Sequence, residues 1–256
     1  MRPGLLLLLA ALVSCGGATE DPNTGAGKAG QLGEPGESKD PPGNTTPPPP
    51  PAPSNAGCAV KTSIHEGFEN GYPAAWGGAN LGGLVLDSGA PISGNTSLKI
   101  TPSPTVQRAY FASPQISGCA MTLKLTVRAE PSFFFGGAKT ILARVTVGSA
   151  AIGIGIGETG HVLHVESPLD NDANALVSTN DAGTIAPNVP TTIAFAFDFL
   201  AHEGTFTVTP AGAPIGAPIP FSLNVAKDTN VSRVLVGLWS TNATGTVWLD
   251  DVAIDP

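Results

Sequence analysis

Apolar and polar residues alternate with a period of two over much of the chain after residue 90. The clearest run, Met121 to Arg128, has an apolar side chain at every second position, with threonine, lysine or arginine between them. This alternation predicts a strand that covers a core with one face only. The same signal predicts strands at Ser97 to Thr101, Ala109 to Ala112, Thr140 to Val147, Ala151 to Ile156, His161 to Glu166, Thr191 to Asp198, Gly204 to Thr209, Ser232 to Trp239 and Thr246 to Ile254.

Helical periodicity is missing from the same part of the chain, where no apolar stripe is bounded by capping residues. Glycine, proline and asparagine punctuate the short alternating runs instead. Many short strands with almost no helix are typical of a β-sandwich or a β-barrel. The sequence therefore predicts an all-β domain of one of these two kinds.

The N-terminal apolar run has a different character. Leu5 to Val13 is too short to cross a bilayer, which takes about 20 residues, and it follows Arg2 as in a secretory signal. Leu12-Val13-Ser14-Cys15 resembles the lipobox of bacterial lipoproteins. The resemblance implies cleavage before Cys15, a lipid on its sulfur, and anchoring in a bilayer, at the outer membrane or the cell surface. An ordinary signal peptide with an incidental cysteine is the alternative.

A Gly- and Pro-rich segment follows, from Gly16 to Gly57, with no aromatic residue. Such a composition buries too little apolar area to offset the entropy of ordering, so we expect a disordered linker. Prolines 47 to 51 favour a stiff polyproline II spacer. The predicted organisation is a signal peptide at 1–14, a lipidated linker at 15–57 and a β-domain at 58–256.

Three cysteines, Cys15, Cys58 and Cys119, leave one unpaired if all are exported. Assigning lipid to Cys15 leaves Cys58 and Cys119 as a predicted disulfide, which would persist in an oxidising compartment. Two buried free thiols are the alternative. The formal net charge of −8 makes nucleic acid an unexpected partner, because binding phosphates needs a basic face.

Short phrases at both ends of the β-domain sharpen the fold class. His65 to Trp76 contains Gly-Phe-Glu followed by Gly, Pro and Trp, Ser93 to Ile100 contains a Gly-x-x-Ser-Leu segment, and Val247 to Ile254 contains Asp-Asp-Val. These phrases resemble the jelly-roll domains of the concanavalin A-like and carbohydrate-binding-module group. The resemblance implies a two-sheet antiparallel β-sandwich, in a group that includes sugar-binding modules, lyases, glucanases and structural domains.

The same resemblance implies a structural calcium ion held by Glu69 and Asp250. Strict alternation in the last strand also puts Asp250 on the side of Trp248, Val252 and Ile254. A carboxylate among apolar neighbours needs a cation or several hydrogen-bond donors. The alternative is that Asp250 and Asp251 only cap an exposed strand end.

Trp239 is the predicted ligand-binding residue. In its strand the regular apolar set is Val234, Val236 and Leu238, which leaves Trp239 on the opposite face. An aromatic ring there could stack on a sugar ring. The alternative is a core tryptophan, and Trp76, Tyr72 and Tyr110 carry a weaker signal of the same kind.

No catalytic residue is predicted. The glucanase pattern of carboxylates alternating on one strand is missing, and so is the Tyr-x-Lys phrase of alginate-lyase-type enzymes. His161 and His164 lie near Glu158 and Glu166, but alternation puts the two histidines on opposite faces. Three hypotheses follow: a membrane-anchored, non-catalytic module, with carbohydrate as the favoured ligand; a structural or protein-interaction domain of the envelope; and a divergent polysaccharide lyase or hydrolase.

Overall fold

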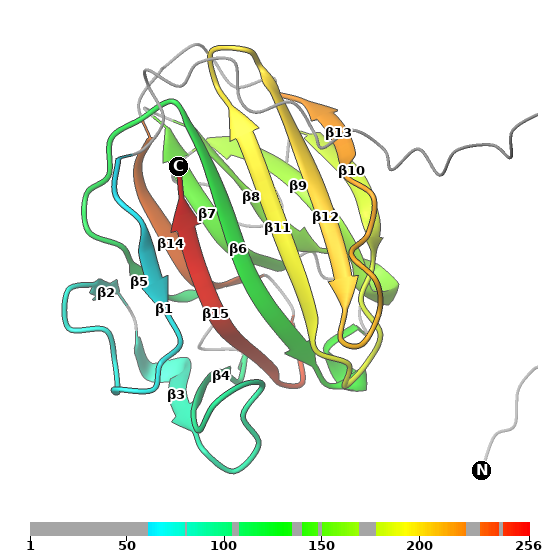
Figure 1. The fold of residues 1–256 in the computed structure, drawn as a ribbon. Coiled ribbons are helices and arrows are strands. Elements are labelled where there is room, and N and C mark those ends of the chain that lie inside the picture. The colour runs from blue at the N-terminus through cyan, green and yellow to red at the C-terminus, as the bar shows by residue number, and fades with distance from the viewer. Residues whose placement is uncertain are drawn as a thin grey trace, which may run out of the picture. The chain divides into compact units, whose positions relative to one another are not determined.

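The computed structural model describes residues 61–79, 81–103, 108–134, 140–147, 150–168, 178–223, 231–240 and 243–256. The predicted signal peptide, lipobox, linker and Cys58 lie outside these residues. Within the described part, no helix has the length and hydropathy of a transmembrane span. The described strands form two antiparallel sheets that lie face to face (Figure 1).

Sheet 1, which is nearer the viewer in Figure 1, has β1 (Ile64–Glu66) paired to β15 outside the main strand order. That order is β13 (Ile219–Ser222), β12 (Glu203–Pro210), β11 (Thr191–Asp198), β6 (Ala120–Ala129), β15 (Val247–Asp255), β4 (Ser97–Ile100) and β3 (Leu84–Asp87).

Sheet 2 has the order β10 (Ser178–Thr184), β9 (His161–Pro168), β8 (Ala150–Ile156), β7 (Thr140–Val147), β14 (Val231–Ser240), β5 (Arg108–Ala112) and β2 (Gly77–Ala79). Short 3₁₀ turns complete the described elements: η1 (Leu81–Gly83), η2 (Pro131–Phe134) and η3 (Glu158–Gly160).

This architecture is the predicted jelly-roll β-sandwich, and every strand predicted from alternation is present with small shifts at its ends. The strands that alternation missed are short or polar: β1, β2, β3, β10 and β13.

The core lies between the two sheets and is built from the apolar face of each strand. In β6, Met121, Leu123, Leu125 and Val127 are all buried in it, which confirms the alternation of that strand. A phenylalanine cluster extends the core under β11, β12 and β13, where the rings of Phe195 and Phe206 stack with centroids 4.7 Å apart. Burial of these faces is the main stabilising contribution to the sandwich.

One polar pair lies inside this aromatic region. His164 Nε2 is 3.0 Å from Glu166 Oε1, and the two side chains are 0% and 4% exposed. The imidazole ring of His164 also stacks on Phe221, with centroids 4.2 Å apart. His164 and Glu166 therefore point into the sandwich from β9.

The last strand contains a bulge that separates the face of Asp250 from the face of Val252 and Ile254. Between Asp250 and Ala253 the β15 register shifts against β6, and Asp251 adopts a positive φ of 47°. Core residues therefore switch from Val247 and Leu249 before the bulge to Val252 and Ile254 after it. Trp248 and Asp250 lie on the outer face of sheet 1, so the prediction that Asp250 shares a face with Val252 and Ile254 is wrong.

Candidate functional site

Trp239 lies on the outer face of sheet 2, away from the main core. Val234, Val236 and Leu238 belong to that core, whereas Trp239 belongs to a separate apolar cluster with Ile141 and Val165. The orientation expected from alternation is therefore present. The Trp239 side chain is only 3% exposed, so its own ring offers little open surface.

Tyr110 on the neighbouring strand β5 covers part of that tryptophan. The two rings stack with centroids 4.7 Å apart and an interplanar angle of 20°. Gly237 makes the stack possible, because it pairs with Tyr110 and a Cβ at Gly237 would come within 2.1 Å of the Ala109 carbonyl oxygen. Tyr110 is half-buried and thus presents aromatic surface that Trp239 does not.

Three arginine residues lie on the same face of sheet 2 as this aromatic stack. The Arg144 guanidinium carbon lies 5.4 Å from the Trp239 ring centroid, and Arg144 is 3% exposed. Arg108, which is exposed, pairs with Trp239 across the β5–β14 ladder, and exposed Arg233 lies further along β14 opposite Thr146. The outer face of sheet 2 therefore combines a stacked aromatic pair with cations, which suits hydrogen bonding and ring stacking with a sugar.

The three arginines were not singled out from the sequence. Arg144 stands alone in a strand whose other buried positions are mostly apolar, and such a placement is the signal that could have marked it. Arg108 and Arg233 occupy ordinary polar positions. Only the strand order brings Arg108 beside Trp239, while Arg233 lies further along the same face.

The predicted metal-binding pair occupies a different place, at the junction of β1, β15 and the loop before β4. A Cβ at Gly67 would lie 3.9 Å from both Asp250 Oδ1 and Glu69 Cγ, so the two acidic residues flank this glycine. The Glu69 carboxylate accepts hydrogen bonds from the backbone amides of Asn95 and Thr96 and from the Asn95 side chain. These donors lower the pKa of Glu69, the Asn95 amide most.

Asp250 is fully buried and is held by hydrogen bonds from both sides. Its Oδ2 accepts from the Ser97 hydroxyl at 2.6 Å and the Ser93 amide at 3.1 Å, while Oδ1 accepts from the Asp251 amide at 2.8 Å. Burial raises the pKa of Asp250, and these hydrogen bonds oppose the rise. The structure thus supplies the donors that a buried carboxylate needs. No group of three or more His, Cys, Asp or Glu residues suited to a metal occurs among the described residues.

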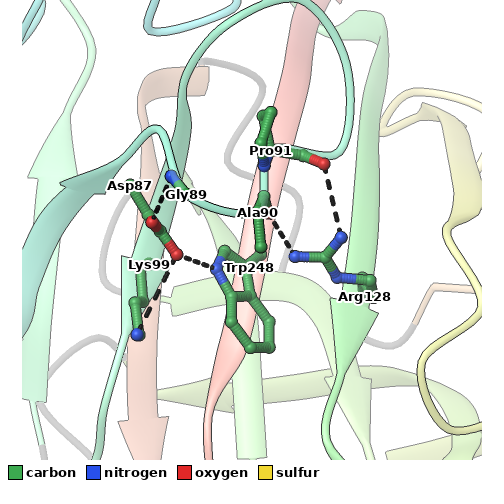
Figure 2. Close-up of polar contacts among 7 residues, drawn as sticks. All are labelled: Asp87, Gly89, Ala90, Pro91, Lys99, Arg128 and Trp248. Carbon is green, nitrogen blue, oxygen red and sulfur yellow. Dashed lines mark hydrogen bonds and ion pairs between the residues drawn. The ribbon is translucent and has the colours of Figure 1, made fainter.

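The loop before β4 covers the outer face of sheet 1 near β3 and β4. Figure 2 shows the Arg128 guanidinium donating to the carbonyls of Ala90 and Pro91. The guanidinium carbon also lies 4.4 Å from the centroid of the Trp248 ring. Trp248 Nε1 donates to Asp87 Oδ2 at 2.8 Å, and Asp87 also accepts from the Gly89 amide. Trp248 is thereby a structural residue that holds the loop.

Acid is expected to weaken this cluster through Asp87. Hydrogen bonds, first that from Trp248, lower the pKa of Asp87 from its ordinary value of 3.8. Ionised Asp87 therefore adds stability above pH 3.8, and this contribution is lost as the pH falls through the lower, folded-state pKa. Asp87→Asn should lose less stability than the wild type over that acid range, measured by urea unfolding at several pH values. Identical acid profiles for the two proteins would contradict this account.

The two histidines near Glu158 and Glu166 do not form a site. His164 and Glu166 face the core, whereas Leu163 and Val165, which alternate with them, lie in the outer cluster with Trp239. His161 lies on the outer face of the strand, opposite His164, as alternation predicted. The side chain of Glu158 is not among those that the structure describes.

Cys119 is buried at the start of β6, and its predicted partner Cys58 is outside the described residues, so their disulfide stays a prediction.

Similarity to known proteins appears at the level of solved structures. No protein-family model and no curated protein matches the chain. The structure titled "Cellulose induced protein, Cip1" aligns with a TM-score of 0.49 and 16% identity, over 75% of this chain and 96% of that one. A β-glucanase of Bacillus licheniformis gives 0.49 and 14%, over 76% and 98%. The alginate lyase vAL-1 from a Chlorella virus gives 0.46 and 12%, over 71% and 93%.

The chain spans less than half of a botulinum neurotoxin serotype G binding domain, 46% of which it matches. By its own strand order, the β-domain is a two-sheet jelly-roll sandwich.

Proposed function

We propose that the chain is a non-catalytic carbohydrate-binding module that binds polysaccharide on the outer face of sheet 2 and is tethered to a bacterial envelope membrane through Cys15. The observation that carries the binding proposal is the stack of Tyr110 on Trp239 with the Arg144 guanidinium beside it. Sugar rings pack their C–H faces on aromatic rings, and their hydroxyls accept hydrogen bonds from side chains placed around the ring.

Tyr110 and Trp239 have different roles in this proposal. Trp239 is buried and supports the stack, whereas half-buried Tyr110 offers the aromatic surface that a sugar contacts. Gly237 holds the stack in register, because any larger residue there would meet the β5 backbone. The predicted ligand-binding residue Trp239 therefore contributes indirectly, by supporting the Tyr110 ring that stacks on it.

A binding experiment with the detergent-solubilised full chain tests this proposal. We expect Tyr110→Ala to weaken binding on a polysaccharide panel by about tenfold or more, the scale of losing a well-placed aromatic contact. Tyr72→Ala is the matched control, because Tyr72 is 47% exposed and lies away from Trp239. Circular dichroism should show both variants folded.

Other outcomes would point to the alternative functions. A panel without any binding, together with co-purification of an envelope protein, would contradict the carbohydrate proposal and favour a structural or interaction domain. Release of unsaturated or reducing ends from a polysaccharide would contradict the non-catalytic part and favour a lyase or hydrolase.

The membrane tether is supported by the lipobox-like Leu12-Val13-Ser14-Cys15 and by the Gly- and Pro-rich linker that follows it. Attached acyl chains bury methylenes worth about 0.8 kcal/mol each, so more than one chain gives stable anchoring. Cys15→Ser should move the protein from the membrane fraction to the soluble fraction. A variant that stays in the membrane fraction would contradict lipid attachment at Cys15.

We also propose that Glu69 and Asp250 hold a structural calcium ion. Burial raises the pKa of Asp250, so a cation beside it would relieve the cost of its charge, and calcium accepts carboxylate and carbonyl oxygens. We expect the melting temperature to be higher in calcium than in chelator, with the difference lost in Glu69→Gln. Equal melting temperatures in the two buffers would contradict a calcium site here.

A further inference from the structure

We propose that the polysaccharide recognised by the outer face of sheet 2 is acidic, and that exposed Arg108 and Arg233 bind its anionic groups while buried Arg144 adds positive charge beside them. This inference rests on the proposed function and names the class of ligand. Carboxylates and sulfate esters would both bind a guanidinium as anionic oxygen groups. The experiment below distinguishes these two sources of the negative charge.

Arginines are concentrated on this face although the chain is acidic. The formal net charge is −8, yet three of the four arginines within the described residues, Arg108, Arg144 and Arg233, belong to the outer face of sheet 2. The fourth, Arg128, holds the loop on sheet 1. None of the aspartate or glutamate side chains that the structure describes projects from the outer face of sheet 2. Three of the four described arginines are therefore grouped on one face of the sandwich.

Strand pairing arranges the three arginines in a row along β14, starting at the aromatic stack. Arg108 pairs with Trp239 at one end of β14, Arg144 pairs with Leu235 nearer its middle, and Arg233 lies toward the other end. Positions 233 and 239 are six residue steps apart, which corresponds to about 20 Å at the rise of roughly 3.3 Å per residue in a strand. Cations spread over that length fit a polymer with charges on successive units better than a single small anion.

The burial of Arg144 adds to the preference for an anion. Its side chain is 3% exposed against Trp239, and a guanidinium keeps its charge in any protein environment. An anion bound at the surface beside such a group is attracted more strongly than it would be beside a fully solvated cation, because the local dielectric constant is lower. The planar fork of the guanidinium also matches the two oxygens of a carboxylate or sulfate.

The test compares charged and neutral forms of the same polymer on the full chain. The probes are polygalacturonate, its carboxyl-reduced neutral form, dextran sulfate and unmodified dextran. We expect at least one charged polymer to bind about tenfold or more tightly than its neutral match, with affinity falling as salt rises. Tighter binding of polygalacturonate assigns carboxylates as the source of the charge, and tighter binding of dextran sulfate assigns sulfates.

Single variants connect that preference to the arginines. Arg108→Ala and Arg233→Ala, both at exposed positions, should each weaken binding of the charged polymer by about tenfold, as expected for a charge-assisted hydrogen bond, and weaken binding of the neutral form by a smaller factor. Lys124→Ala is the matched control, since it removes an exposed cation from the outer face of sheet 1. Arg144→Lys, checked by its melting curve, keeps the charge but should lose part of the affinity.

The failures of the two proposals are distinguishable. Equal affinity for charged and neutral polymers, unchanged by Arg108→Ala and Arg233→Ala but lowered by Tyr110→Ala, would overturn the acidic preference and leave carbohydrate binding standing. Absence of binding to these probes and to the wider panel would overturn both.

Discussion

Replacing Phe195 by alanine is expected to lower the free energy of unfolding by about 3 to 5 kcal/mol, the usual cost of deleting a buried phenylalanine ring. Phe195 is fully buried, and its ring contacts Phe197, Phe206 and Phe221 with centroids 4.7 to 5.2 Å apart. The ring joins β11 to β12 and β13, so its loss leaves a cavity where three strands of sheet 1 meet the core.

Urea unfolding followed by circular dichroism measures this effect. Thr207→Ala is the matched control, because Thr207 alternates with the buried Phe206 on β12 and lies on the half-buried outer face. We expect that variant to stay within about 1 kcal/mol of the wild type. A loss below about 1 kcal/mol in Phe195→Ala would mean that these strands do not pack on the core as described.

Asp250→Ala is expected to cost about 3 kcal/mol, because it removes the acceptor for three donors at once. The Ser97 hydroxyl, itself in a fully buried residue, and the amides of Ser93 and Asp251 would lose their partner, and a buried donor left unpaired costs about 1 to 3 kcal/mol. The loop before β4 would also lose its attachment to β15.

Asp251→Asn is the control for this prediction. Asp251 is exposed and has a positive φ, a conformation that asparagine tolerates, so we expect a change below about 1 kcal/mol. Amide hydrogen exchange at Ser93 adds a local measurement, since it should accelerate in Asp250→Ala only. Unchanged exchange and unchanged urea midpoints would show that Asp250 does not hold this loop.

Local alternation was sufficient to predict most strands, but not β1, β2, β3 and β13, which have three or four residues each, or the polar β10. In β6 each apolar residue covers the core and each polar one faces outward, so the pattern carries the complete answer. β10, with the sequence Ser-Thr-Asn-Asp-Ala-Gly-Thr, has no apolar stripe at all. Its pairing with β9 gives it the strand conformation, and a pairing partner is not visible in the residues of a single segment.

The error at Asp250 has a similar origin. Alternation assigns faces correctly only while the strand is regular, and one additional residue at the bulge reverses every face after it. Nothing in Leu249-Asp250-Asp251-Val252 distinguishes a regular strand from a bulged one by period alone. Asp250 precedes the bulge and lies beside Ser97 on β4, where the hydrogen bonds that it needs are available.

The outer face of sheet 2 could be predicted only in part for the same reason. Alternation assigned Trp239 to its face, but the residues beside it come from β5 and β7, far away in the sequence. Tyr110 and Arg144 become its neighbours through strand order, which the sequence does not specify. The candidate site therefore emerged from the topology rather than from a motif.

The most direct test of polysaccharide binding on the outer face of sheet 2 is an NMR titration of the full chain with polygalacturonate, following backbone amides and the tryptophan indole signals. The account predicts shifts concentrated in β5, β7 and β14, with Tyr110, Arg144 and Trp239 among them, and little change in β11 and β12. Shifts confined to sheet 1 would contradict this assignment of the binding face.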